Sequence, residues 1–89
     1  MAADARVYLR LMKLRVELQG YLDQYSPNDS NAPFAFEVED GATVLELMRK
    51  LHIPEEMAAV VVVSDEARDS AHALAEGDRV TLIPPLGGG

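Results

Sequence analysis

The amino-acid sequence predicts an α+β fold, in which one mixed sheet of four to five strands has a single main helix packed across it. Two pairs of segments have the alternating or β-branched composition of strands, and apolar residues at helical spacing lie between the pairs. The chain has 89 residues, 48% of them hydrophobic, which suits one small domain with a single core. The expected order is strand, strand, helix, strand, strand.

The first pair of segments predicts a hairpin with a long loop. Apolar and polar residues alternate strictly from Lys13 to Gln19, and they alternate again from Phe34 to Val38. Between these strands, residues 21–25 have the length of one helical turn, and residues 26–31 are a dense cluster of turn formers. A glycine turn at Gly41 is expected to end the hairpin.

The main helix is expected from about Thr43 to His52. Thr43 followed by Glu46 has the spacing of a capping box, in which a hydroxyl and a carboxylate accept hydrogen bonds from free N–H groups at the helix start. Pro54 is expected to end the helix, and Ile53 to plug the end of the core. The apolar residues at positions i, i+3, i+4 and i+7 are Val44, Leu47, Met48 and Leu51.

The second pair of strands follows the helix. The β-branched run Val60–Val63 predicts a short strand that is buried on much of both faces. Residues 64–75 are polar and are expected to be irregular, and the turn formers of residues 76–78 lead into the strand Arg79–Ile83. Val80 and Leu82 of this last strand are expected to share the core face.

The domain is expected to span residues 12–85. Apolar residues before Met12 alternate out of step with those after it, which favours a poorly ordered N-terminal extension over residues 1–11. A tag, a wrongly assigned start, or an extension of the first strand through a bulge are the alternatives. Residues 86–89 are predicted to be a flexible glycine tail.

Composition excludes several classes of function. The chain has no cysteine, so disulfides, thiolate metal sites and a cysteine nucleophile are excluded. The net charge of −7 disfavours nucleic acid and anionic membranes as partners, and no apolar run approaches a membrane span. His52 and His72 have no partner at metal-ligand spacing, and no carboxylate pair suggests acid–base catalysis. We expect a cytoplasmic protein without a bound metal.

The C-terminal segment is the most informative feature. Pro84 and Pro85 lack N–H donors and must end the strand before them. The glycines have no Cβ, so they suit a narrow channel and leave the α-carboxyl of Gly89 sterically open. We therefore expect this carboxyl to be the reactive group. The segment consists of Pro84, Pro85, Leu86, Gly87, Gly88 and Gly89.

These motifs resemble a known family. A turn Glu-Gly-Asp-Arg-Val, two more strand residues, Ile-Pro-Pro and a terminal Gly-Gly are similar to the ubiquitin-like sulfur carriers, the family of the thiamine-pathway carrier and the small subunit of molybdopterin synthase. The stretches Met12–Val16 and Gly41–Val44 resemble the family's first strand and helix entry. The resemblance covers nearly all of residues 12–89 and implies a β-grasp (ubiquitin-like) fold. The Ser64-Asp65 turn, the N-terminal extension and the third glycine depart from the family pattern.

The resemblance implies a carrier that is not itself an enzyme and binds no cofactor. A partner adenylyltransferase of the ubiquitin-activating type would use ATP to adenylate Gly89, and a persulfide on a partner would then displace AMP. The resulting thiocarboxylate would donate sulfur to a thiazole synthase or to a large subunit of the molybdopterin synthase type. Gly88 and Gly89 match the family's diglycine, whereas Gly87 falls where the family is variable and adds only extra flexibility.

Residues beside the tail are candidates for partner docking. Ile83 is expected to face outward at the tail exit, with Leu86 a few residues beyond, and an exposed apolar pair there suits contact with an activating enzyme. The alternative is that Ile83 caps the core. The docking set as a whole comprises Ile83, Pro84, Pro85, Leu86 and Gly87.

Two other functions are open at this point. The protein could be a ubiquitin-like modifier conjugated to lysines of other proteins through Gly89, or a β-grasp interaction module with an unreactive tail. An acidic carrier with a free tail is expected to be a monomer on its own. The sulfur acceptor is determined by the partner's active site and not by these residues.

Overall fold

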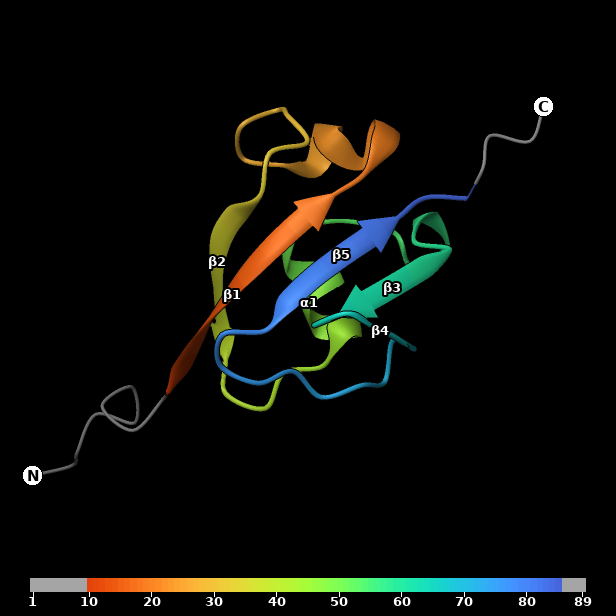
Figure 1. Ribbon diagram of the computed structural model, residues 1–89. Helices are drawn as coiled ribbons and strands as arrows, with labels where there is room; N and C mark the ends of the chain where they lie inside the picture. The colour runs from red at the N-terminus through yellow and green to blue at the C-terminus, as the bar shows by residue number, and fades with distance from the viewer. Residues whose placement is uncertain (1–9, 86–89) are drawn as a thin grey trace, which may run out of the picture.

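Residues 10–85 are described by the computed structural model, which contains a five-stranded sheet and one α-helix (Figure 1). Of the expected N-terminal extension over residues 1–11, residues 1–9 lie outside the described residues, as do residues 86–89 of the expected tail. The elements are β1 (Leu11–Leu18), the 3-10 helix η2 (Gly20–Tyr25), β2 (Phe34–Glu39), α1 (Val44–Lys50), the 3-10 helix η3 (Glu55–Met57), β3 (Val60–Val63), β4 (Glu66–Arg68) and β5 (Arg79–Ile83).

The strands lie in the order β2-β1-β5-β3-β4. β1 pairs antiparallel with β2 and parallel with β5, whereas β3 pairs antiparallel with both β5 and β4. A parallel pair needs a long crossover, and α1 lies within it, behind the sheet in Figure 1. The predicted α+β fold with one main helix is confirmed. The last strand of the chain is the central strand of the sheet.

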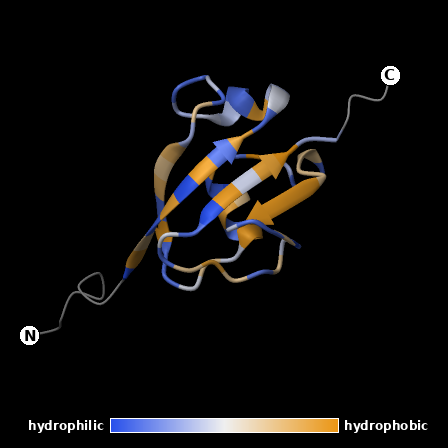
Figure 2. Cartoon of the chain, in the orientation of Figure 1, coloured by the Kyte–Doolittle hydropathy of each residue, from blue (hydrophilic) through white to orange (hydrophobic). Residues whose placement is uncertain are grey.

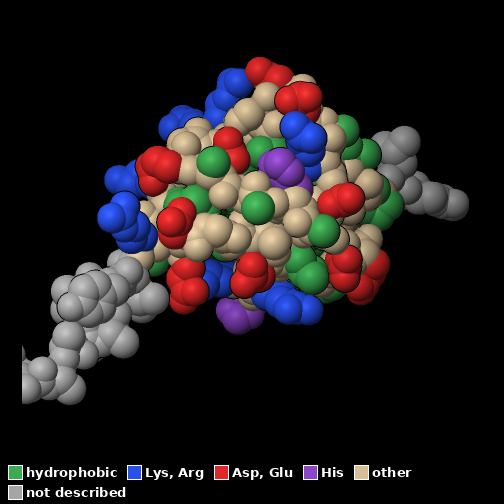
Figure 3. All heavy atoms as spheres, turned by 90° about the horizontal axis from the view of Figure 1, so that it is seen from below, with side chains coloured by type: hydrophobic (Ala, Val, Ile, Leu, Met, Phe, Trp, Pro, Cys, Tyr) green, Lys and Arg blue, Asp and Glu red, His purple; other side chains and the backbone are tan. Residues whose placement is uncertain are grey.

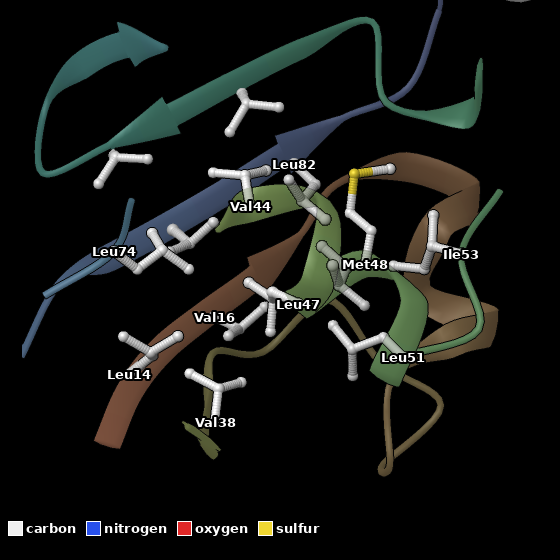
Figure 4. Close-up of a cluster of buried hydrophobic side chains, with 14 of the residues drawn as sticks. Leu14, Val16, Val38, Val44, Leu47, Met48, Leu51, Ile53, Leu74 and Leu82 are labelled. Carbon is white, nitrogen blue, oxygen red and sulfur yellow. The ribbon is translucent and has the colours of Figure 1, made fainter. Parts of the chain in front are cut away.

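The core lies between α1 and one face of the sheet (Figure 4). Along β1 and β5 every second side chain is buried, and those of Val16, Val80 and Leu82 are completely inaccessible to solvent. The parallel register places Val16 opposite Val80 on this face. The inward-facing residues expected from the alternation are therefore in the core.

Strand β1 begins at Leu11, one residue before the expected start of the domain. Leu11 is 54% exposed, whereas Met12 is buried on the same face as Leu14. The alternation of buried residues in β1 therefore begins at Met12, where the apolar alternation of the sequence changes, because Met12 and not Leu11 faces the core.

Helix α1 has the predicted capping box at its start. Glu46 N donates to Thr43 Oγ1 at 3.3 Å, and Thr43 N donates to Glu46 Oε1 at 2.9 Å. The helix ends at Lys50, earlier than expected, because His52 adopts a left-handed conformation with φ of 63°. Ile53 N then donates to Met48 O at 2.9 Å, and Ile53 is buried, as predicted.

Two expectations for the second strand pair were wrong. Only one face of β3 is buried, because α1 covers only the core side of the sheet, and Val60 is 44% exposed on the other. The stretch expected to be irregular contains β4, which pairs with β3 through a two-residue turn at Ser64 and Asp65. Both turn residues have positive φ, at 47° and 76°, as a hairpin turn of type I′ requires.

No helix among residues 10–85 is long and apolar enough to cross a membrane.

Candidate functional site at the root of the tail

The end of β5 is held from both sides where the chain leaves the sheet. Gln19 N, just after β1, donates to Leu82 O at 3.0 Å, and Ala59 N, just before β3, donates to Ile83 O at 2.8 Å. Pro84 and Pro85 have no N–H with which to continue the pairing, and the strand ends at Ile83 as predicted. The chain therefore leaves a fixed point in the middle of the sheet.

The bend after β1 lies against the first proline. Gly20 has φ of 55°, a conformation that residues with a side chain rarely adopt. A Cβ at this position would lie 3.3 Å from Cγ of Pro84, closer than an ordinary contact. Glycine at position 20 therefore allows both the left-handed backbone conformation and the close approach of the Pro84 ring.

The second proline is contacted by a tyrosine from the same bend. The hydroxyl of Tyr21 donates to Pro85 O at 3.3 Å, a long hydrogen bond across 64 positions of sequence. The ring of Tyr21 is 43% exposed, which is high for a large apolar side chain. Sequence reasoning missed this contact. The available signal was that parallel strands end at the same edge of a sheet, which brings residues after β1 to the exit of β5.

Exposed apolar side chains surround this exit. Val60 is directly opposite Ile83 in the antiparallel register, so both project from the face that α1 does not cover. In Figure 2 the hydrophobic colour is continuous along β3 and reaches the end of β5. Ile83 faces outward as expected and is partly buried, so it does not cap the core. We call this surface the apolar collar; its residues are Tyr21, Val60, Ile83, Pro84 and Pro85.

Charged side chains gather at the other end of the uncovered face, where β5 begins. Arg15 and Arg79 are neighbours in the parallel register, and Arg79 forms an ion pair with Asp65 at 2.8 Å. A hollow of about 310 Å³ lies here, lined also by Glu17 and Thr81. The uncovered face is thus divided into a charged end at the start of β5 and an apolar end at the chain exit.

No group of side chains suited to hold a metal ion is found within residues 10–85. No three residues of the types His, Cys, Asp and Glu lie together there in a way that could hold a metal ion. Figure 3 shows the two histidine side chains well separated on one face of the molecule. The pKa of Glu46 is lowered, chiefly by the hydrogen bond from the backbone N–H of Thr43, but this carboxylate belongs to the cap of α1.

The residues proposed to react lie outside the described part. Gly88, Gly89, Gly87 and Leu86 have no described position, and the docking candidates Ile83, Pro84 and Pro85 are brought together at the exit. The site that the structure does show is therefore the root from which the tail departs, with Gly20, Tyr21 and Val60 added to the predicted set.

A mixed sheet with a central β5 and one helix packed across one of its faces defines a ubiquitin-like fold of the β-grasp type. A model of the ThiS family matches residues 21–89. The chain belongs to the ThiS family, and it is a ubiquitin-like sulfur carrier by this membership. No curated protein sequence matched the chain.

Solved structures share the fold. The solution structure of the HVO 2177 protein from Haloferax volcanii is similar with a TM-score of 0.69 and 20% identity, over 89% of this chain and 88% of that one. A protein described as putative molybdopterin converting factor, subunit 1, from Pyrococcus furiosus has a TM-score of 0.65 and 22% identity, over 84% of this chain and 99% of that one. The crystal structure of SAMP1 from Haloferax volcanii has a TM-score of 0.64 and 23% identity, over 86% of this chain and 99% of that one.

Proposed function

We propose that this protein carries sulfur as a thiocarboxylate on Gly89. One observation carries the proposal: in a member of the ThiS family, the central strand β5 ends at Ile83, two prolines that contact the bend after β1 follow, and the sequence then ends in Leu-Gly-Gly-Gly. We further propose that the protein is the substrate of partner enzymes and is not itself an enzyme, as its family membership suggests.

The chemistry needs activation because a carboxylate is a poor electrophile. A carboxylate oxygen of Gly89 attacks the α-phosphorus of ATP, pyrophosphate leaves, and an acyl-adenylate forms on a ubiquitin-activating-type adenylyltransferase. The sulfur of a partner's persulfide then attacks the carbonyl carbon, and AMP leaves with the electron pair of the broken C–O bond. A thiol cleaves the resulting acyl disulfide, which leaves the thiocarboxylate and a disulfide. The sulfur comes from the partner because this chain has no cysteine.

The loaded carrier then gives its sulfur to a synthase. A thiazole synthase or a large subunit of the molybdopterin synthase type is the proposed acceptor, and the choice depends on the acceptor's active site. The reaction uses ATP and takes place in the cytoplasm, and the carrier is a monomer between encounters. The apolar collar is the proposed contact with the activating enzyme, since exposed aromatic and branched side chains are typical anchors of interfaces.

Intact-mass spectrometry tests the proposal. The full chain is incubated with an activating enzyme of the thiamine or molybdopterin type, ATP and a sulfur donor. Its mass should increase by the difference between sulfur and oxygen, whereas a chain without Gly88 and Gly89, or a reaction without ATP, should show no such product. An unchanged mass with both types of activator would overturn the proposal. Lysines of other proteins that carry residues 80–89 through an isopeptide bond to Gly89, the remnant that trypsin leaves after cutting at Arg79, would identify a modifier in its place.

A further inference from the structure

We propose that Tyr21 and Gly20 form a clamp that fixes the direction in which the tail leaves the body, with Tyr21 as a positioning residue that acts through Pro85. The inference rests on the proposed function, because it concerns how the same carboxylate is presented to the activating partner. It adds residues that no tail motif contains, since both lie more than 60 positions earlier in the chain.

The geometry shows an anchor at each successive residue of the root. Leu82 O and Ile83 O accept backbone hydrogen bonds from opposite sides, the ring of Pro84 lies against Gly20, and Pro85 O accepts from the Tyr21 hydroxyl. The two prolines already restrict φ, so the rotations left at the root are chiefly about ψ. The hydrogen bond from Tyr21 to Pro85 O restrains this remaining rotation about ψ.

The bend that carries the clamp is itself braced. The side-chain amide of Asn31 donates to Leu18 O at 2.7 Å and to Gly20 O at 3.0 Å, so the loop between β1 and β2 ties down the bend. Gln24 Nε2 also donates to Tyr21 O at 3.1 Å. A tyrosine on a braced bend holds its hydroxyl in place, which a tyrosine on an unsupported loop would not do.

The clamp holds the last proline before the proposed reactive group. Four residues follow Pro85 in the sequence, and four residues span at most about 14 Å. A root fixed in direction presents the tail to a partner channel with less orientational freedom to lose on binding. Loss of the clamp should therefore weaken productive binding of the carrier, and it should not slow the chemical step once the tail is bound.

The test compares two tyrosines of the same 3-10 helix. Tyr21→Phe removes the clamping hydroxyl and keeps the ring, whereas Tyr25→Phe removes a hydroxyl from a residue packed against the core. By carbon-13 NMR, the Pro85 carbonyl resonance should move in Tyr21→Phe and stay in place in Tyr25→Phe. In the thiocarboxylation assay, Tyr21→Phe should raise KM for the carrier about threefold and leave kcat unchanged, the size expected from one long neutral hydrogen bond.

The outcomes separate the two proposals. An unmoved Pro85 resonance, or an unchanged KM in Tyr21→Phe with an active wild type, would overturn the clamp while the carrier function stands. A wild-type chain that is never thiocarboxylated would overturn the carrier function first. Gly20→Ala should give a larger KM increase than Tyr21→Phe, because it displaces Pro84, and Tyr21→Phe decides the question if Gly20→Ala does not fold.

Discussion

Two glycines with the same backbone requirement have different surroundings. Gly20 and Gly41 both have positive φ, at 55° and 84°. A Cβ added at Gly41 would meet no atom within 4 Å, so only the backbone requires glycine there, whereas Gly20 also faces the ring of Pro84. The second requirement couples the bend after β1 to the root of the tail.

Gly20→Ala should therefore destabilise the protein more than Gly41→Ala. Each substitution places a side chain in a left-handed conformation, at a cost of about 1–2 kcal/mol. Gly20→Ala adds the displacement of Pro84. Urea unfolding of both variants measures the difference, and equal losses of stability would show that the Gly20–Pro84 contact is unimportant.

At the scale of elements, helix α1 is short and depends on its ends. It has seven residues, fewer than an isolated helix needs to be stable in water. The capping box between Thr43 and Glu46 begins it, and the left-handed His52 ends it, so its buried side chains are held at a defined height over the sheet.

The cap should make stability depend on pH. The pKa of Glu46 is lower in the folded protein than its ordinary value of 4.5, so its ionised form favours folding. This contribution is fully present above pH 4.5 and is lost as pH falls through the folded-state pKa. In urea unfolding, Glu46→Gln should lower stability most near neutral pH, and its difference from the wild type should shrink in acid. A difference that stays constant with pH would contradict this role.

Elements with a clear period were predictable, and those that depend on neighbours were not. The alternation in β1 and the spacing in α1 predicted both elements and their buried faces. β4 was missed because Glu66–Arg68 is exposed and has no apolar pattern; it forms because the turn at Ser64 and Asp65 returns the chain along β3.

The candidate site divides in the same way. Ile83, Pro84 and Pro85 were predictable because strand, proline and glycine chemistry is local. Tyr21 and Val60 were missed because only strand pairing brings them close to the end of β5, and the sequence of one segment does not show which strand it pairs with. The role of the glycines themselves stays a prediction, since Gly87, Gly88 and Gly89 lie outside the described residues.

At the scale of the whole molecule, β5 joins two halves of the sheet that do not pair with each other. The β1–β2 hairpin lies on one side of it and the β3–β4 hairpin on the other. Val80 and Leu82, both completely buried, contribute to the core from this strand. Without β5 neither hairpin has a neighbour on its inner edge.

Deletion of residues 79–89 should therefore abolish cooperative unfolding. A two-stranded hairpin is marginally stable at best, and this deletion would leave each half of the sheet as an isolated hairpin. Deletion of Gly88 and Gly89 alone should change stability by less than about 0.5 kcal/mol, since it leaves all of β5 intact. Thermal unfolding followed by circular dichroism checks both variants. A sharp transition in the longer deletion would show that the hairpins support each other without the central strand.

The position of β5 late in the chain also means that the protein can fold only near the end of its synthesis. A nascent chain cannot close its sheet until residues 79–83 have been made, because β5 is the central strand that joins the two hairpins. Copies interrupted before residue 79 would stay unfolded and exposed to proteases, and would not accumulate as folded proteins that lack the C-terminal glycines.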